Sequence, residues 1–501
     1  MIKGISTLST FLRLLEKYWW LLLIVCVGIT YVLIMLLARG QNVWFDEGYS
    51  IILAKQPFTR LLALTGVDAH PPLYYLLLRL WGSTFNWSEF ALRSLSAVAA
   101  SGTVGVMILL VRRLFMKKVA LLTMPFLVLS PFFLRYGYEI RMYALVGLIG
   151  VVATLFLVTA LQTKKKKWWI LYSIFVALGM YTLYMSVVIW LAHFVWLLVR
   201  SIKQKDITLK QPWIKAYIGA VILFLPYVPT FLYQMTHSAL PGIGSVLTID
   251  GLGGVLSLMM GYIPSWQIGG ILSIALLLFV GLGIYLTIYS LKKMPQTNKQ
   301  WFWLLLICFL LPLAFYIVTS LLPKPFFIPR YMAHIVIFFY GLIGIISALG
   351  WRYGKRITAI IFGGLAIILL TFGVVQVLRT GNFNFERLQM PETTSIRSVI
   401  TCDSSSVVMA DDPYTYIDSA YYFDGCNLRF YSPENINFSG GYAPLHDSGL
   451  RVSSAESVHA STLYVLHWVG SESLFQPSSH YSLKTSQTFN KQVVDYYVLQ
   501  P

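Results

Sequence analysis

Charged residues are scarce in this chain of 501 residues. Only 12% of them are Asp, Glu, Lys or Arg, and 57% are hydrophobic, whereas soluble domains average roughly 25% charged residues. Most of the surface therefore faces something other than water, which excludes an ordinary soluble protein. Negative charge is scarcer than positive charge, with 20 acidic against 38 basic residues. The excess of positive charge lies mostly in short loops between apolar segments, so we expect no nucleic acid partner.

Cysteine is also rare, with four in the chain. Cys26 and Cys308 lie within apolar segments. Cys402 and Cys426 lie in the polar C-terminal part, where they would form a disulfide in an oxidising compartment or remain as two free thiols. No Cys/His spacing typical of a metal site is present.

Long apolar segments dominate the rest of the sequence. A membrane-spanning helix needs about 20 apolar residues, and eleven segments approach this length. The first is followed by no signal-peptide cleavage site, so we expect it to be retained. The fifth and sixth are short, and a tight turn around Thr182 would join them. The eleven segments are 19–38, 92–111, 119–134, 142–161, 168–181, 184–199, 216–232, 268–290, 301–322, 331–349 and 357–378.

The loops between these segments alternate in charge. Basic residues gather in the N-terminal segment and in loops 112–118, 164–167, 200–215, 292–299 and 352–356. The positive-inside rule assigns these loops to the cytoplasm. The N-terminus is then cytoplasmic, and the part of the chain after the eleventh segment is extracytoplasmic. The other loops hold most of the acidic residues of the membrane part.

Secondary structure is also predicted for two stretches outside the apolar segments. The first outer segment, 39–91, contains a short amphipathic helix at 57–64 that is expected to lie along the membrane surface. Residues 380–501 are predicted to form a small α/β domain, with strands at 406–410, 427–431, 461–469 and 493–499 and a helix at 414–423. We therefore expect a membrane module of residues 1–379 and a soluble extracytoplasmic domain of residues 380–501. A loop rich in Gly and Pro, 233–267, is expected to form a lid.

Polar clusters occur in the first outer segment. Asp46 and Glu47 directly follow the first apolar segment. They either stabilise the N-terminus of the next helix or supply a general base that takes a proton from an attacking hydroxyl. His70 stands before two prolines, which form a rigid turn or hold the ring toward a phosphate.

Two further clusters lie in later outer loops. Arg135 and Arg141 flank Glu139 between the third and fourth apolar segments, on the side where the positive-inside rule does not explain arginine. Arginine forks suit phosphate oxygens, but an Arg–Glu pair that holds the loop would explain them equally well. The cluster from Lys324 to Tyr331 places Arg330 just before the tenth segment, where it would bind a phosphate or anchor to lipid headgroups.

In order along the chain, these motifs resemble the family 39 glycosyltransferases, which include protein O-mannosyltransferases and lipid A aminoarabinose transferases. The motifs are an acidic pair after the first helix, His-Pro-Pro-Leu-Tyr-Tyr at 70–75, Glu-x-Arg-x-Tyr at 139–143 and Pro-Arg-Tyr at 329–331. The resemblance covers roughly residues 19–350. It implies a polytopic α-helical membrane protein of the GT-C architecture, with about eleven helices. It also implies transfer of a sugar, with inversion, from a polyprenyl-phosphate donor to a hydroxyl acceptor at the outer face of the plasma membrane.

The resemblance also implies roles for individual residues. The acceptor would be a lipid, a glycan or a protein; the inserted lumenal domain of the eukaryotic protein mannosyltransferases is missing, which disfavours a protein. No cofactor is certain, and a divalent metal ion near Asp46 and Glu139 remains open because no ligand set is evident. The implied residues are Asp46, Glu47 and Glu139 for catalysis, His70, Arg135, Arg141 and Arg330 for the donor phosphate, and Tyr74, Tyr138, Tyr143 and Tyr331 as the lining.

Two other functions are consistent with a polytopic protein. A lipid or glycan transporter or flippase would be expected to show inverted repeats and charged residues at mid-membrane, and the sequence shows no convincing repeat. A non-catalytic membrane scaffold would use the C-terminal domain to bind a partner.

Overall fold

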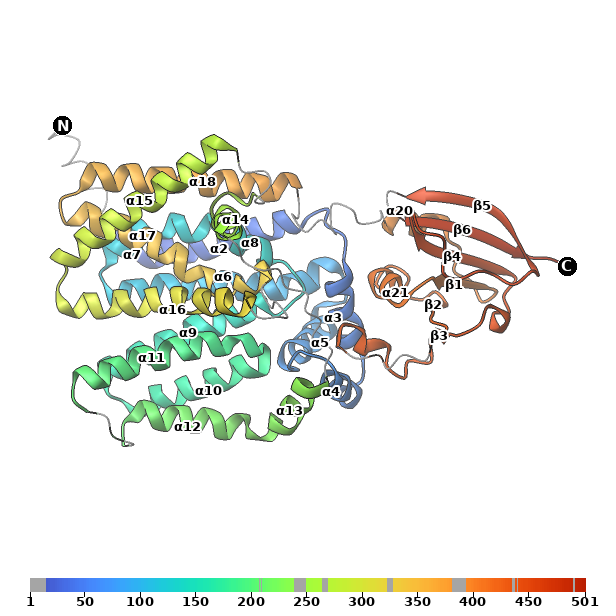
Figure 1. Ribbon diagram of the computed structural model, residues 1–501, viewed down its shortest axis with the longest axis horizontal. Helices are drawn as coiled ribbons and strands as arrows, with labels where there is room; N and C mark the ends of the chain where they lie inside the picture. Colours follow the sequence, from blue (N-terminus) through green and yellow to red (C-terminus); the bar gives the residue numbers. More distant parts are fainter. Residues whose placement is uncertain are drawn as a thin grey trace. The chain divides into compact units, whose positions relative to one another are not determined.

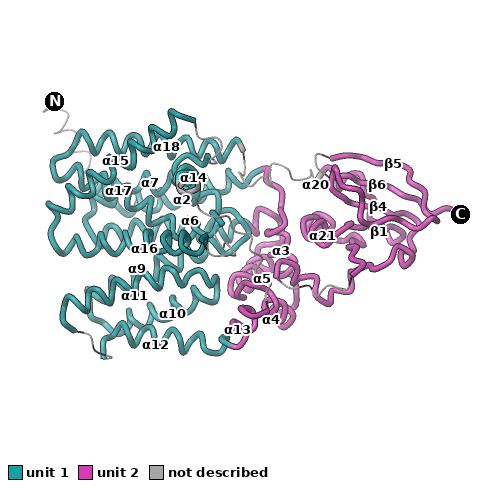
Figure 2. Tube along the Cα trace, in the orientation of Figure 1, with its two compact units in different colours: residues 1–39, 93–228, 241–383 teal, residues 40–92, 229–240, 384–501 magenta. Residues whose placement is uncertain are grey.

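The computed structural model is mainly helical (Figure 1). It describes residues 15–206, 208, 210–237, 249–263, 269–321, 328–380, 393–434, 438, 440–489 and 492–501. The chain divides into two compact units (Figure 2). Unit 1 contains residues 1–39, 93–228 and 241–383, and unit 2 contains residues 40–92, 229–240 and 384–501.

Unit 1 is a bundle of apolar helices. Within the described ranges, eight helices are long and apolar enough to cross a membrane, and the bent pair α7–α8 would make a ninth. Two shorter helices of 17 residues each, α10 and α17, coincide with the expected segments 168–181 and 331–349. The predicted fold class, a polytopic helical membrane protein, is confirmed. The helices are α2 (Trp19–Ala38), α6 (Glu89–Leu114), α7 (Lys117–Val128), α8 (Pro131–Gly137), α9 (Tyr143–Thr163), α10 (Lys166–Thr182), α11 (Val187–Lys203), α12 (Pro212–Phe224), α14 (Ile249–Gly261), α15 (Gly270–Lys293), α16 (Gln296–Ser320), α17 (Val336–Arg352) and α18 (Arg356–Thr380).

The segment expected as one span at 119–134 is instead two helices, α7 and α8, bent by 63°. The break has a local cause. Pro131 begins α8 and has no backbone N–H to continue α7. The preceding residue, Ser130, leaves the helical region with φ −93° and ψ 87°, as expected before proline. The bend sets the start of the segment that carries Arg135 and Glu139.

The basic loops of unit 1 lie together at one end of the bundle. Arg113 donates to Gln162 at 2.8 Å, joining the ends of α6 and α9. Arg352 contacts the Met116 sulfur, joining the end of α17 to the start of α7. Similar contacts join the end of α15 to the α17–α18 loop and the end of α11 to the start of α16, through Tyr289 to Tyr353 and Arg200 to Gln300. This is the charge segregation that the sequence predicts.

Unit 2 combines the first outer segment with the C-terminal part. The outer segment forms α3 (Phe45–Lys55), α4 (Phe58–Val67) and α5 (Leu73–Phe85). The predicted amphipathic helix at 57–64 corresponds to α4. The loop expected at 233–267 is partly helical, because α13 (Val228–His237) extends into it and α14 lies within it. Within and just after that expected lid, residues 238–248 and 264–268 lie outside the described residues.

The C-terminal part contains a six-stranded sheet of order β3-β2-β1-β4-β6-β5. Strands β1 to β4 run parallel, and β6 pairs antiparallel with β4 and β5. The central strand β1 is buried at all five positions, which is typical of a parallel strand covered on both faces. Its core includes Val407, Met409, Leu463 and Val465. The strands are β1 (Ser406–Ala410), β2 (Leu428–Tyr431), β3 (Arg451–Val452), β4 (Thr462–Trp468), β5 (Tyr481–Phe489) and β6 (Gln492–Leu499), and helix α21 spans Pro413–Ser419.

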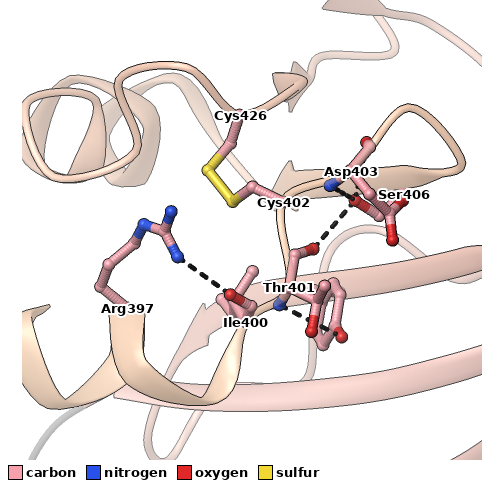
Figure 3. The surroundings of a disulfide bond; sticks show 8 residues. Arg397, Ile400, Thr401, Cys402, Asp403, Ser406 and Cys426 are labelled. Carbon is pink, nitrogen blue, oxygen red and sulfur yellow. Dashed lines mark hydrogen bonds between the residues drawn. A yellow bond between two sulfur atoms is a disulfide. The ribbon is translucent and has the colours of Figure 1, made fainter.

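The two cysteines of this domain form a disulfide (Figure 3). Cys402 precedes β1 and Cys426 precedes β2, and their Cα atoms are 5.0 Å apart. Among the residues drawn around the disulfide, Arg397 donates to the Ile400 carbonyl at 3.0 Å. Of the two alternatives left open by the sequence, the structure therefore has the disulfide rather than two free thiols.

Candidate functional site

The outer loop of unit 1 that precedes α9 holds buried charges. Arg135, at the end of α8, is 1% exposed, and Glu139 is fully buried. The Arg135 Nη1 and Glu139 Oε2 atoms are 3.7 Å apart. The Arg141 amide donates to the Glu139 carbonyl at 2.6 Å, which closes the turn. The ion pair supports the interpretation that Arg135 and Glu139 hold the loop, and the backbone bond fixes the position of Arg141.

Aromatic rings surround this ion pair. The Arg135 guanidinium carbon lies 5.1 Å from the Tyr136 ring centroid and 4.9 Å from that of Tyr138. Such cation–π contacts favour the charged form of the guanidinium in a dry environment. Tyr136 also meets Tyr143 edge to face at 5.7 Å. Tyr138 therefore borders the buried charge, and Tyr143 lies one ring further away, against Tyr136.

The late segment approaches the same cluster through Tyr136. Arg330 lies in a short 3₁₀ helix, Pro329–Met332, and is close enough to Tyr136 to interact with it electrostatically. Tyr316 of α16 donates to the Tyr331 carbonyl at 3.0 Å and so anchors this turn. Lys324 of the same predicted cluster lies outside the described residues.

Tyr136 and Tyr316 were not among the predicted site residues. Tyr136 lies inside the Arg-Tyr-Gly-Tyr-Glu motif, but no spacing distinguished it from Tyr138. A signal for Tyr316 was present, since it is a polar aromatic residue inside an apolar segment, where buried polar groups usually have a specific partner.

In unit 2, Asp46 and Glu47 occupy the first turn of α3. Asp46 is half-buried, whereas Glu47 is fully buried. A helix N-terminus stabilises negative charge, so the helix-stabilising interpretation of this pair has structural support. The Ser50 hydroxyl donates to the Asp46 carbonyl at 2.9 Å within the same helix.

The second motif of the outer segment packs beside α3. His70 Nδ1 lies 3.2 Å from Oδ2 of Asp68, a buried carboxyl that orients the ring. The two prolines follow, and α5 begins at Leu73. Tyr75 of α5 lies 6.0 Å from Tyr49 of α3 and 5.9 Å from Tyr74, between ring centroids. The structure therefore brings the α3 and α5 motifs together within unit 2.

The C-terminal domain packs directly against α3, which sequence reasoning missed. The Phe45 and Tyr414 rings stack at 4.5 Å with an interplanar angle of 8°. A Cβ atom added to Gly48 would overlap the Ile417 carbonyl oxygen, so α3 and α21 approach at backbone distance. The C-terminal domain is thus a direct neighbour of the helix that carries Asp46. The glycine after the acidic pair was the available signal for this close approach.

A metal ion gains no support from these groups. Among the residues that the structure describes, no cluster of three or more His, Cys, Asp or Glu side chains could hold a metal ion.

The predicted site residues fall into two groups, one in each unit. Unit 2 holds Asp46, Glu47, His70 and Tyr74, and unit 1 holds Arg135, Tyr138, Glu139, Arg141, Tyr143, Arg330 and Tyr331.

Comparison with known proteins identifies the architecture. The structure of ArnT from Cupriavidus metallidurans bound to undecaprenyl phosphate matches with a TM-score of 0.62 and 12% identity, covering 96% of this chain and 98% of that one. Its apo form matches with a TM-score of 0.61 and 11% identity, over the same shares. The chain has the ArnT fold. The match covers both the helical bundle and the C-terminal domain.

The model of the dolichyl-phosphate-mannose-protein mannosyltransferase family matches residues 69–230. This segment includes the motifs at His70 and at 139–143, so the predicted resemblance to family 39 glycosyltransferases of GT-C type is confirmed. An Archaeoglobus fulgidus oligosaccharyltransferase is a more distant match, with a TM-score of 0.48 and 13% identity, covering 90% of this chain and 70% of that one. No curated protein matches the chain.

Proposed function

We propose that the protein is a membrane glycosyltransferase that moves a sugar from a polyprenyl-phosphate donor to a hydroxyl acceptor on a lipid, a glycan or a protein. The observation that carries the proposal is the ArnT fold over 96% of the chain. The family match on residues 69–230 supports it independently of the fold. The ArnT structure that matches was solved with undecaprenyl phosphate, which supports the choice of a lipid phosphate.

In this proposal, arginines and His70 bind the donor phosphate. A polyprenyl phosphate is a good leaving group, and fixed positive charge near its oxygens stabilises the negative charge that develops as the sugar departs. Arg141 is proposed for this role because it lies in the loop between α8 and α9, where the bond from its amide to the Glu139 carbonyl fixes its position. Arg330 would add a second fork from the late segment.

Asp46 serves as the general base of the proposed reaction. It takes the proton of the acceptor hydroxyl as the oxygen attacks the anomeric carbon, and the phosphate leaves from the opposite face with inversion. One carboxylate is sufficient, because no glycosyl-enzyme intermediate forms, unlike in retaining glycosidases. The half-buried position of Asp46 suits this role better than the full burial of Glu47. Glu47 and Glu139 are then proposed to act by positioning their neighbours.

The reaction is proposed to take place at the outer face of the plasma membrane, with the N-terminus inside and the C-terminal domain outside. The clustering of the basic loops at one end of unit 1 supports this orientation through the positive-inside rule. The Cys402–Cys426 disulfide supports it as well, because disulfides persist mainly outside the reducing cytoplasm.

The proposal is tested with Asp46→Asn, which removes the base while keeping the side chain nearly the same size. The matched control is Asp206→Asn, which removes an exposed acid in the basic loop 200–215. Both variants should accumulate in the membrane as the wild type does. Asp46→Asn should lose sugar transfer by at least roughly 100-fold, within the range that general base catalysis contributes. Full transfer by Asp46→Asn would refute the assignment of the base.

A further inference from the structure

A groove runs between α11 and α16 at the end of unit 1 where the basic loops lie. These helices pack side by side, and a cavity of about 660 Å³ opens between them. Three basic residues line it, namely Arg200, Lys203 and Lys299, together with Trp303 and apolar residues of α16. Neither the predicted site nor the proposed reaction uses these residues.

The basic end of the groove is held in place by neighbouring side chains. Arg200 donates to the Gln300 side chain, and its guanidinium lies 5.7 Å from the Trp196 ring centroid. Trp196 Nε1 donates to the Gln300 carbonyl at 3.1 Å, and its ring stacks on Trp301 at 5.7 Å. A guanidinium has five N–H donors, so Arg200 keeps donors beyond the one that Gln300 accepts. The contacts with Gln300 and Trp196 fix the orientation of the Arg200 side chain before any ligand binds.

The other part of the groove is apolar and open. Leu306, Ile307 and Leu310 line it along α16, and Trp303 is 49% exposed. From Lys299 to Leu310 the helix rises by roughly 16 Å. A cationic end followed by an apolar wall of this length matches a phosphate headgroup with an acyl chain. The apolar side chains would not contribute to the binding of a soluble anion, and the three cations would not contribute to the binding of an uncharged lipid.

We propose that this groove binds an anionic phospholipid from the leaflet on the basic side of the membrane. The phosphate lies among Arg200, Lys203 and Lys299, and one acyl chain follows Leu306 and Leu310. Basic pockets between membrane helices on the cytoplasmic side commonly take such headgroups. Because the groove joins α11 to α16, the lipid would hold together two helices that are distant in sequence. The proposal does not depend on the glycosyltransferase function.

The test is native mass spectrometry of the full-length protein, purified in detergent and supplied with dioleoyl phosphatidylglycerol or dioleoyl phosphatidylcholine. The variant is Lys203→Gln with Lys299→Gln, which leaves the contacts of Arg200 with Gln300 and Trp196 in place. The matched control is Lys292→Gln with Lys293→Gln, two exposed lysines at the end of α15 that lose the same charge. Melting temperatures without added lipid show whether each variant is folded.

We expect the wild type and the control to retain phosphatidylglycerol in preference to phosphatidylcholine. The Lys203/Lys299 variant should bind phosphatidylglycerol roughly 10- to 30-fold more weakly, since each lysine near a charged lipid contributes roughly a three- to fivefold step in affinity. Equal retention of the two lipids by the wild type would overturn the proposal. So would equal loss in the variant and the control, or competition by inorganic phosphate at a concentration equal to that of the lipid.

Discussion

Removing one hydroxyl group should loosen the contact between the C-terminal domain and the start of α3. The Val43 amide donates to the Tyr422 hydroxyl at 2.7 Å, and this hydroxyl donates to Glu89 at 2.8 Å. Tyr422 thereby joins the C-terminal domain to both ends of the outer segment. Tyr422→Phe keeps the ring and removes both hydrogen bonds. Because α3 begins at Phe45, two residues after Val43, the substitution releases the start of the helix that carries Asp46.

The expected loss of stability follows from the two bonds. Val43 is 1% exposed, and a buried amide left without its partner costs about 1–3 kcal/mol. Glu89 is half-buried and can turn toward water, so its lost bond costs about 1 kcal/mol. The sum is about 2–4 kcal/mol. For a unit of this size, each kcal/mol lowers the melting temperature by roughly 2–4 °C.

The matched control is the neighbouring residue. Tyr421→Phe removes the 3.2 Å bond to the Trp87 carbonyl, and the loss of such a bond costs about 0.5–1.5 kcal/mol. The assay is thermal unfolding of the purified full-length protein in detergent, with protease cleavage of the C-terminal domain as a second readout. Tyr422→Phe should melt clearly below Tyr421→Phe and should be cleaved faster. If the two variants melt at the same temperature, the reasoning about Val43 and Glu89 is wrong.

Two further substitutions test the packing and the electrostatics of unit 2. Gly48→Ala should destabilise unit 2 by about 1–3 kcal/mol, as overpacking does, because the new methyl group would overlap the Ile417 carbonyl oxygen. Gly66→Ala is the matched control and should not destabilise the unit, because its methyl group would make only ordinary contacts. Unchanged melting of Gly48→Ala would show that α21 does not approach α3 this closely. Burial and the neighbouring Asp412 raise the pKa of Asp411 from 3.8 to about 6. The folded state then holds this proton more tightly than the unfolded state does, so the contribution of Asp411 to stability falls as the pH rises from about 4 to about 6. Asp411→Asn should therefore raise the free energy of unfolding at pH 7 by about 1–2 kcal/mol, after allowance for water access, and with it the melting temperature. At pH 4 the melting temperature should be nearly unchanged. Equal effects at the two pH values would contradict this.

Much of the fold could be predicted from the sequence because its signals are local. Strand β1 was predicted at its observed bounds, 406–410, since a continuous apolar stretch between polar residues is visible in one short window. Helix α21 begins within one residue of its predicted start at 414, because Asp412 accepts a hydrogen bond from the Thr415 amide at 2.6 Å and caps the helix, but it ends at Ser419 rather than at 423. Strand β5 was missed, since most of its side chains are exposed and its sequence has no apolar alternation.

The site was less predictable, because its contacts join distant parts of the chain. The motifs around Asp46, His70 and Glu139 were recognisable from their residue types and order. Nothing in their spacing showed that α21 would pack on α3. Nor did it show whether Arg135 would pair with Glu139, as it does in the structure, or with a ligand. The bend between α7 and α8 was also missed, because a hydropathy window averages over Pro131.

The most direct test of the proposed function is mass analysis of envelope glycans and lipids. The cells compared lack the protein, carry the wild type, or carry Asp46→Asn at the same level in the membrane. We expect a sugar addition in the cells with the wild type that is missing from the other two. Identical glycans and lipids in the presence and absence of the wild type would contradict the transferase function. Full sugar addition with Asp46→Asn would instead contradict only the role given to Asp46.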